Sequence, residues 1–381
     1  MWSFPFHTND VASLDWGGLK DRFQWIRDME YVEQDPIFHA EGNVEIHTRM
    51  VLTEMLNSNE FKALPPQDQR IQFAAVLLHD VEKRSTTKRE MENGRETVTS
   101  KGHAKKGEFT ARGILYRDIP TPFLIREMIC KLVKHHALPI RIFDKEFPQK
   151  EVLRTSLECN NHMLATIARA DMRGRLSLSN DIPELMYQID TFVEFCKENE
   201  CYDSKGPFAS DLTRFDFFAK ESGVWPKQDT FDDTTCNMFI MCGIPASGKS
   251  HYVAKHLSHL PIVSMDAIRI EHGMKRYDKT NNGHAIQIAK ESAKKHLAAK
   301  QDFVWDATNV TRTNRESLIN LVAPYNPKIH IIYVERPYKS VVADNLNREH
   351  PVRRDVLDNY LTKLDVPSLS EAHTVTHCVS E

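Results

Sequence analysis

The chain has 381 residues, of which 41% are hydrophobic and 27% are charged, a balance typical of globular proteins with room for two domains. Its formal net charge of −3 argues against a broadly basic surface for nucleic-acid duplexes, so any nucleic-acid contact should be local. The seven cysteines contain no C-x-x-C pair and no apolar run is long enough to span a bilayer, so we expect a cytoplasmic protein without a disulfide framework, a zinc ribbon or a membrane partner.

Amphipathic patterns predict helices throughout the first part of the chain. Apolar residues recur at helical spacing over 46–56, 71–78 and 125–133, and a further helix is expected over 151–171. Gly206-Pro207 and Trp225-Pro226 mark a connector over 205–233, with a short helix at 212–219. We therefore expect an all-helical domain over residues 1–233, with its core at about 36–180 and the connector at its end.

A set of histidines and aspartates lies on or at the ends of these predicted helices. The set consists of His47, His79, Asp80, His103, His135, His136 and Asp171. Imidazole and carboxylate groups ligate divalent transition metals such as Mn, Co, Ni, Zn, Cu or Fe. One metal would use His47, His79, Asp80 and Asp171, and a second would share Asp80 with His103 and with His136 or His135. Two adjacent metals can clamp a phosphoester and activate water for its hydrolysis.

This ordered set resembles the HD phosphohydrolase superfamily, and in particular the HD domain of bacterial tRNA CCA-adding enzymes. In that domain Glu-Gly-Asp-Val precedes the first histidine, as Glu41-Gly-Asn-Val does here, with Asn43 as a departure at a position that is no expected ligand. The later segment Ala170-Asp171-Met-Arg173-Gly-Arg175 is similar to Ala-Asp-Val-Arg-Gly-Arg. The resemblance implies metal-dependent phosphoester hydrolysis in which Asp80 takes part in catalysis.

Other polar residues near this set have two interpretations each. Lys83-Arg84 and Lys105-Lys106 either bind a substrate phosphate or are surface charge on helices. His39 is expected beside the ligands or at the surface, and His162 is expected to be structural.

The pattern changes after the connector, from helical spacing to an alternation of short apolar runs and helices. The runs lie at 238–242, 262–263, 303–305 and 329–334, and the helical stretches lie at 250–259, 285–299, 312–322 and 338–348. Alternating strands and helices predict a parallel sheet covered by helices on both faces. We therefore expect an α/β domain over residues 234–381.

A phosphate-binding loop joins the first of these strands to the first helix. Gly243-Ile244-Pro245-Ala246-Ser247-Gly248-Lys249-Ser250 matches G-x-x-x-x-G-K-[ST] in the strand-to-helix context that such a loop requires. Backbone N–H groups and the helix N-terminus favour bound phosphates there. We expect Lys249 to bridge the outer phosphates of ATP or another nucleoside triphosphate and Ser250 to ligate Mg²⁺.

Two acidic residues follow the next two strands and indicate a reaction. Asp266 comes directly after the run at 262–263, so it should lie at the carboxyl edge of the sheet and accept the proton of an attacking hydroxyl, unless it only caps the next helix. Arg269, one helical turn later, can hold a substrate phosphate. Asp306 ends the third strand and is either a partner of Mg²⁺ or Lys249, or a helix cap.

Arginines also gather at 348–354, late in this domain. Such residues suit a lid that closes over the ATP phosphates and neutralises transition-state charge, and a solvated basic helix face is the alternative. Arg348 is the first candidate for this role. Arg353 is the second candidate, with Arg354 as its alternative.

The second domain resembles the 5′-hydroxyl polynucleotide kinases, which carry a phosphate loop, then D-x-x-R, then an arginine-bearing lid. The resemblance implies that Asp266 is the general base and that Arg269 binds the phosphate of the first nucleotide. An HD domain followed by such a kinase is similar to the bacterial HD-Pnk end-healing proteins. That family implies phosphorylation of 5′-OH ends and removal of 2′,3′-cyclic phosphate or 2′-phosphate from single-stranded RNA or DNA ends, which a nucleic-acid ligase then joins.

Two other functions fit the same motifs. The chain could combine an HD nucleotidase with a kinase for free nucleosides or nucleotides, a reading that its net negative charge favours. It could also be a binding module that senses ATP and metal, although the intact Lys249, Ser250 and Asp266 argue against that function.

Overall fold

The computed structural model describes residues 1–92, 94–274, 279–348 and 350–380. The chain forms two compact units, Met1–Pro207 and Phe208–Glu381. Within the described residues, no helix combines the length and the apolar character needed to cross a membrane.

The first unit is built mainly from helices. They are α1 (Trp16–Arg22), α2 (Gln24–Asp28), α3 (Val44–Asn57), α4 (Asn59–Ala63), α5 (Pro66–Leu78), α6 (Lys83–Thr86), α7 (His103–Gly113), α8 (Phe123–His135), α9 (Pro148–Glu158), α10 (Asn161–Arg173) and α11 (Ile182–Glu198). Short 3-10 turns lie at Val11–Ser13, Met29–Tyr31 and Ile142–Asp144, and a π turn at Ile114–Asp118 continues α7.

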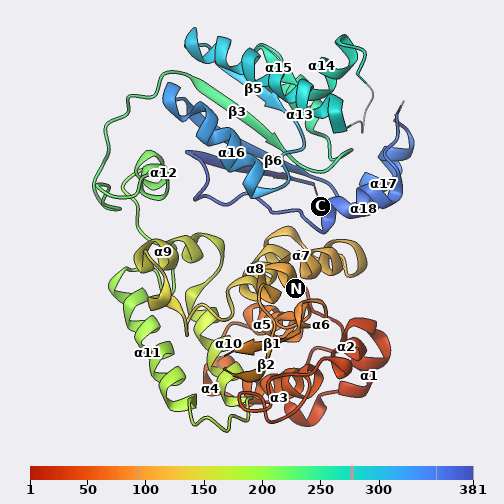
Figure 1. Ribbon diagram of the computed structural model, residues 1–381, viewed down its shortest axis with the longest axis vertical. Coiled ribbons are helices and arrows are strands. Elements are labelled where there is room, and N and C mark those ends of the chain that lie inside the picture. The colour runs from red at the N-terminus through yellow and green to blue at the C-terminus, as the bar shows by residue number, and fades with distance from the viewer. Residues whose placement is uncertain (93, 275–278, 349, 381) are drawn as a thin grey trace. The chain divides into compact units, whose positions relative to one another are not determined.

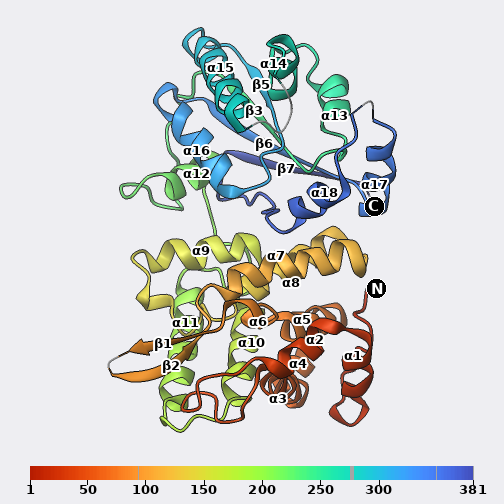
Figure 2. The same cartoon turned by 45° about the vertical axis from the view of Figure 1, so that its right-hand side comes forward.

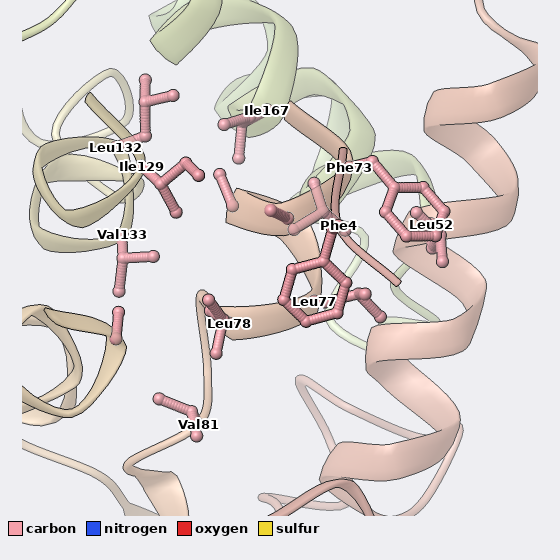
Figure 3. Close-up of a cluster of buried hydrophobic side chains, with 14 of the residues drawn as sticks. Phe4, Leu52, Phe73, Leu77, Leu78, Val81, Ile129, Leu132, Val133 and Ile167 are labelled. Carbon is pink, nitrogen blue, oxygen red and sulfur yellow. The ribbon is translucent and has the colours of Figure 1, made fainter. Parts of the chain in front are cut away.

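Helix α5 lies at the centre of this unit. Pro66 starts the helix at its first position, where the missing N–H costs nothing. Every residue from 71 to 78 is buried, including the polar Gln72, so this part of the helix is buried on all sides rather than along one stripe. Figure 3 shows Leu77 and Leu78 among side chains from α3, α8 and α10. The buried helix ends at His79, so the core positions the His79-Asp80 pair.

A β-hairpin interrupts the helices, which makes the prediction of an all-helical first domain wrong at this point. Strands β1 (Lys88–Glu92) and β2 (Arg95–Thr99) pair in antiparallel register, and they project from the helices in Figure 2. Strand β1 is mostly exposed and β2 is mostly half-buried, so no alternation of apolar and polar residues marks them in the sequence. Ion pairs hold the hairpin instead, including Arg95 Nη2 with Asp35 Oδ1 at 2.5 Å.

The second unit contains a five-stranded parallel sheet among its described residues. Its strands are β3 (Asn237–Cys242), β4 (Ile262–Ser264), β5 (Phe303–Asp306), β6 (Lys328–Glu335) and β7 (Thr374–Val379), in the order β4-β5-β3-β6-β7. Each neighbouring pair is parallel, and β3 is the central strand (Figure 1). The helices are α12 (Asp211–Ala219), α13 (Lys249–His256), α14 (Met265–Glu271), α15 (Lys279–Ala298), α16 (Arg312–Val322), α17 (Tyr338–Leu346) and α18 (Arg354–Leu361), with a 3-10 turn at Ala323–Tyr325.

Helices cover both faces of this sheet. Val253 and Leu257 of α13 pack with Met241 and Ile332 in one apolar cluster. The next residue after Met241 is Cys242, which points to the opposite face and contacts Arg315 of α16. The predicted parallel sheet covered by helices is therefore confirmed, whereas β7 and α18 were not predicted.

The connector packs on the second unit. Arg214 of α12 donates hydrogen bonds to the carbonyl oxygens of Leu369 and His373, at 3.0 and 2.7 Å. The ring of Phe215 lies 4.1 Å from the ring of His373. These contacts explain why the division between the compact units falls between Pro207 and Phe208. That division lies earlier in the chain than the boundary near Asp233 expected from the sequence.

Candidate active sites

The phosphate loop lies between β3 and α13, and its backbone is in the form that the motif requires. Gly243 has a φ of 148°, and a Cβ atom there would lie 2.5 Å from the carbonyl oxygen of Val334. Gly248 has a φ of 102° and starts α13. A larger side chain at Gly243 would clash with the Val334 carbonyl, and at Gly248 it would strain the backbone. These are the physical reasons for glycine at the two positions.

Backbone carbonyl groups of the phosphate loop hold the side chain of Lys249 in place. Its Nζ donates hydrogen bonds to the carbonyl oxygens of Gly243 and Ile244, at 2.8 and 3.0 Å. Burial lowers the pKa of Lys249 to about 8, an effect that the nearby carboxylate of Asp306 opposes only in part. A phosphate group arriving beside this ammonium would stabilise its charged form.

A cavity of about 760 Å³ opens above the loop, within the range usual for small-molecule sites. Five of the eight predicted loop residues line it: Pro245, Ala246, Gly248, Lys249 and Ser250. The other three, Gly243, Ile244 and Ser247, lie behind them and are buried. The same cavity is also lined by predicted residues from other segments, namely Asp266, Arg269, Asp306 and Arg348.

Asp266 lies in the first turn of α14, directly after β4. The helix is capped by Ser264, whose side-chain oxygen accepts a hydrogen bond from the Ala267 N–H at 3.4 Å, so the alternative role of Asp266 as the cap is wrong. Asp266 Oδ1 accepts a hydrogen bond from Arg269 Nη1 at 2.9 Å. Asp266 and Arg269, the residues predicted to contact the hydroxyl substrate, therefore line the cavity as an ion pair.

Asp306 ends β5 and faces the same cavity. The next helix, α16, is capped by Thr311, so Asp306 does not serve as its cap either. Burial raises the pKa of Asp306, and the negative charge of Asp266 raises it further, while Lys249 acts in the opposite direction. Asp306 is thus the electrostatic partner of Lys249, one of the two roles expected from the sequence.

The candidate lid arginines differ in their surroundings. Arg348 lines the cavity. Arg353 does not, because its side chain is 81% exposed and pairs with Asp355 at 2.8 Å. Arg354 pairs with Asp358 at 3.2 Å and is also outside the lining.

Two features of this site were not predicted. Arg336 lines the cavity and pairs with Asp344 of α17, and its position directly after β6 was the available signal. Arg315 is fully buried and donates hydrogen bonds to the carboxylate of Glu371 and to the carbonyl oxygen of Asn309, the latter at 3.0 Å. These bonds hold the loop after β5, whose Thr308 carbonyl oxygen accepts a hydrogen bond from the Gly243 N–H of the phosphate loop at 2.9 Å. No pattern in one sequence predicts them.

The second group of predicted residues gathers inside the first unit. His47 lies on α3, His79 and Asp80 follow α5, and His103 starts α7. His136 follows α8, and Asp171 lies near the end of α10. All except His103 are buried.

Asp80 is the centre of this His/Asp cluster, which comprises His47, His79, Asp80, His103, His136 and Asp171. Its Oδ2 lies 3.2 Å from His79 Nε2 and 3.8 Å from His47 Nε2. Its Oδ1 lies 3.2 Å from His103 Nε2 and 4.0 Å from His136 Nε2. Asp171 Oδ1 completes the first side at 3.0 Å from His47 Nε2. One carboxylate thus faces two groups of nitrogen donors.

Backbone groups orient the imidazole rings. His79, His103 and His136 each place Nδ1 at 2.7 to 2.8 Å from the carbonyl oxygen three residues earlier. A carbonyl only accepts, so each Nδ1 carries a proton and each Nε2 is turned toward the cluster. His47 is oriented by a carboxylate instead, because its Nδ1 lies 2.9 Å from Glu41 Oε1.

The residues of the cluster fit divalent cations. His47 Nε2, His79 Nε2, Asp80 Oδ1 and Asp171 Oδ1 are buried and form no hydrogen bond with any described group, whereas Asp80 Oδ2 also faces the ammonium of Lys83 at 2.8 Å. Buried polar atoms without partners are costly, and a cation would satisfy them together. Two triads, His47-His79-Asp80 and Asp80-His103-His136, hold their donor atoms within 4.8 Å of one another.

Electrostatics keep most of these groups in the form that binds metals. Burial raises the pKa of Asp80, but the charges of His79 and Lys83 outweigh it and hold that pKa well below its usual range. Burial lowers the pKa of His136 to about 3, with help from His103 and His79. His79 differs, because the Asp80 carboxylate outweighs burial and raises its pKa. Metals bind ionised carboxylates and neutral imidazoles.

The remaining predicted residues of the first unit have other partners. His135 Nε2 lies 2.9 Å from Glu158 Oε2 and is not part of the cluster, so His136 is the member of the pair that the fold brings to Asp80. His39 contacts Glu41 at 2.8 Å, and His162 contacts Asp203 at 2.9 Å.

The lysines and arginines of the first unit that could bind a substrate phosphate also differ in their partners. Lys83 Nζ lies 2.8 Å from Asp80 Oδ2. Arg84 pairs with Asp28 at 2.7 Å, and Lys106 pairs with Glu82 at 3.3 Å. Lys105 is exposed on α7.

Comparison with known proteins matches residues 238–367 to a family described as the AAA domain. Among solved structures, a kinase candidate from Chloroflexus aurantiacus J-10-fl is 19% identical, and the likeness covers 39% of this chain and 87% of that one, with a TM-score of 0.33. An unliganded sugar kinase from Janibacter sp. HTCC2649 is 17% identical, covering 38% of this chain and 84% of that one, with a TM-score of 0.29. Residues 238–367, which include the phosphate loop and its cavity, therefore form a P-loop domain similar to the AAA family.

Proposed function

We propose that this chain is a bifunctional enzyme that heals the ends of broken nucleic acid. Its second unit phosphorylates 5′-OH ends of RNA or DNA with ATP, and its first unit removes 2′,3′-cyclic phosphate or 2′-phosphate from the other end. The observation that carries the kinase half is the shared cavity of Lys249, Ser250, Asp266 and Arg269. The products, a 5′-phosphate and a free 3′-OH, are the ends that a nucleic-acid ligase joins.

In the kinase reaction each residue of the cavity has one task. Lys249 binds the outer phosphates of ATP, and Ser250 would hold Mg²⁺, which neutralises phosphate charge when bound. Asp266 accepts the proton of the 5′-OH while the hydroxyl oxygen bonds to the γ-phosphorus of ATP. ADP leaves with the electrons of the broken P–O bond. Arg269 holds the adjacent nucleotide phosphate, and Arg348 stabilises the charge of the phosphoryl group in transfer.

In the phosphoesterase reaction the His/Asp cluster would hold two divalent cations. His47, His79, Asp80 and Asp171 would hold the first, and Asp80, His103 and His136 would hold the second. The cations, when bound, polarise a phosphoester and lower the pKa of water. The chain itself fixes the donor atoms, because backbone carbonyls and Glu41 orient the imidazoles.

A substitution of Asp266 tests the kinase half. Asp266→Asn keeps the size of the side chain but removes the proton acceptor, so transfer of label from γ-labelled ATP to a 5′-OH oligonucleotide should fall by roughly 100-fold or more. Asp355→Asn is the control and should retain activity, because Asp355 of α18 is exposed and does not line the cavity. The proposal fails if Asp266→Asn transfers phosphate at the wild-type rate.

Substitutions in the cluster test the phosphoesterase half. His79→Ala and Asp80→Ala should lose bound transition metal, measured by elemental analysis, together with hydrolysis of a 2′,3′-cyclic phosphate end. Kinase activity should stay at the wild-type level in both variants. His162→Ala, which removes an exposed contact to Asp203, is the matched control. Equal loss of both activities in His79→Ala would contradict two separate sites.

The second candidate function keeps both chemistries but acts on free nucleosides and nucleotides. The net charge of −3 favours it, because a polynucleotide must approach a negatively charged protein. Parallel phosphorylation assays with a nucleoside and with a 5′-OH oligonucleotide distinguish the two. A preference for the nucleoside would replace end healing with small-molecule phosphorylation.

A further inference from the structure

Helix α15 forms part of the wall of the phosphate-loop cavity. Its buried alanines, Ala285, Ala289 and Ala293, recur every four residues and so lie on one face of the helix. The helix packs against α14 and β4 (Figure 1). It therefore stands at the β4 edge of the sheet, where Asp266 and Arg269 line the same cavity.

Two side chains of α15 line the cavity. They are Ile286 and Lys290, each directly after one of the buried alanines, and their spacing of four residues puts them on one face of the helix. Lys294, one turn further on, does not line the cavity and pairs with Glu291 at 3.3 Å. Lys290 is thus the positive charge that α15 brings to this wall.

Lys290 differs from the other cations of the cavity in its partners. Its side chain is half-buried, and it forms no hydrogen bond or ion pair with any residue in the described part of the chain. Arg269 and Arg336 pair with carboxylates, and backbone carbonyls hold Lys249. Arg348 acts on the phosphoryl group in the proposed kinase reaction. The ammonium of Lys290 therefore remains for a further anion in the cavity.

The two candidate acceptors differ in the anions that they bring. A nucleoside has no phosphate, and a nucleoside 3′-phosphate has one, which Arg269 holds in the proposed reaction. A 5′-OH polynucleotide carries a second phosphate, one nucleotide further from the hydroxyl that Asp266 deprotonates. Lys290 lines the same cavity on the helix next to α14, so it is suited to a phosphate beyond Arg269.

We propose that Lys290 binds the second phosphate of a 5′-OH polynucleotide and so selects polynucleotide acceptors over single nucleotides. An ammonium on a flexible stem acts as a point charge, which suits a phosphate diester whose position shifts with the bases of the strand. Such a contact is local, so it is compatible with the net charge of −3. This role rests on the proposed kinase function and specifies its acceptor class.

The test measures phosphorylation of three acceptors by the full chain: a nucleoside 3′-phosphate, a 3′-phosphorylated dinucleotide and a 5′-OH oligonucleotide. The wild-type protein should have a lower KM for the two longer acceptors. Lys290→Gln should raise the KM of these two by about 10-fold at unchanged kcat, because the lost contact only binds the acceptor. The KM of the nucleoside 3′-phosphate should not change. Lys290→Arg, which keeps the charge, should recover most of the loss.

Lys294→Gln is the matched control, because it removes the same charge from the same helix outside the cavity. It should leave all three KM values at the wild-type level. A salt series gives a second readout. The slope of log KM for the oligonucleotide against log salt concentration should fall by about 0.7 in Lys290→Gln, as expected for the loss of one phosphate contact on a single strand.

The outcomes separate this proposal from the kinase function on which it rests. An unchanged KM for the longer acceptors in Lys290→Gln would overturn the role of Lys290 and leave the kinase intact. An equal rise for all three acceptors would also overturn it, since Lys290 would then support the fold or the first phosphate. A wild-type protein that phosphorylates none of the three would overturn the kinase function itself.

Discussion

Among single residues, Lys249 should make the binding of ATP at the phosphate loop depend on pH. Its pKa of about 8 means that the ammonium is charged below pH 8 and loses its proton as the pH rises through that value. Bound triphosphate favours the charged form. ATP binding at about pH 9 should therefore take up a proton, and the affinity should fall by up to about 10-fold per pH unit above 8.

Calorimetry in two buffers of different ionisation enthalpy measures this uptake. At pH 7 Lys249 is already charged, so the same titration should show almost no uptake by this group and serves as the control. Absence of proton uptake at pH 9 would mean that Lys249 keeps its proton in the protein without nucleotide.

Single residues also show where sequence reasoning stops. The motif was enough to identify Lys249 and Ser250 as candidate binding residues, because the geometry of the loop depends only on neighbouring residues. The choice between His135 and His136 depends on how α8 packs, since the structure turns one to Glu158 and the other to Asp80.

At the scale of elements, the contact of α10 with α3 gives a test of stability. Gly174→Ala would place a methyl group 2.6 Å from the backbone of Val51, and backbone cannot rotate away as a side chain does. The helices must separate, so we expect the free energy of unfolding of the first unit to fall by about 1–3 kcal/mol. Chemical denaturation followed by helical circular dichroism measures this loss.

Gly113→Ala is the matched control for this substitution. Gly113 is the last residue of α7, and a Cβ atom there meets nothing within 4 Å. Alanine is the better helix former, so this change should leave stability unaltered or raise it by about 0.5–1 kcal/mol. Equal effects of the two changes would show that the approach to Val51 does not matter.

The elements that were predicted and those that were missed differ in burial. Strands β3, β5 and β6 are mostly buried and give apolar runs that stand out in the sequence. Strand β7 lies at the edge of the sheet with a half-polar sequence, and the hairpin β1–β2 is charged on both faces. Their stability comes from partners elsewhere in the chain, which local periodicity does not report.

At the scale of the whole molecule, two units with separate cores should respond to separate ligands. One core surrounds α5, and the other lies between α13 and the sheet. A chelator should lower only the melting temperature of the first unit. ATP with Mg²⁺ at 100 times its dissociation constant should stabilise only the second unit, by about 2.7 kcal/mol or roughly 5–10 °C.

Scanning calorimetry measures both shifts in one protein. His79→Ala should abolish the effect of the chelator, and Lys249→Ala should abolish the effect of ATP. A shift of both transitions by one ligand would show that the two sites are energetically coupled.

The order of the sites along the chain has a consequence for biosynthesis. Every member of the His/Asp cluster lies between His47 and Asp171, so the ribosome has made all of them before it starts the second unit at Phe208. At about 5–20 residues per second, the rest of the chain takes about 10–35 s to translate. The nascent first unit can fold during that interval and, under the proposed phosphoesterase function, bind metal before the second unit exists. The parallel sheet must wait for β7, its last strand to emerge.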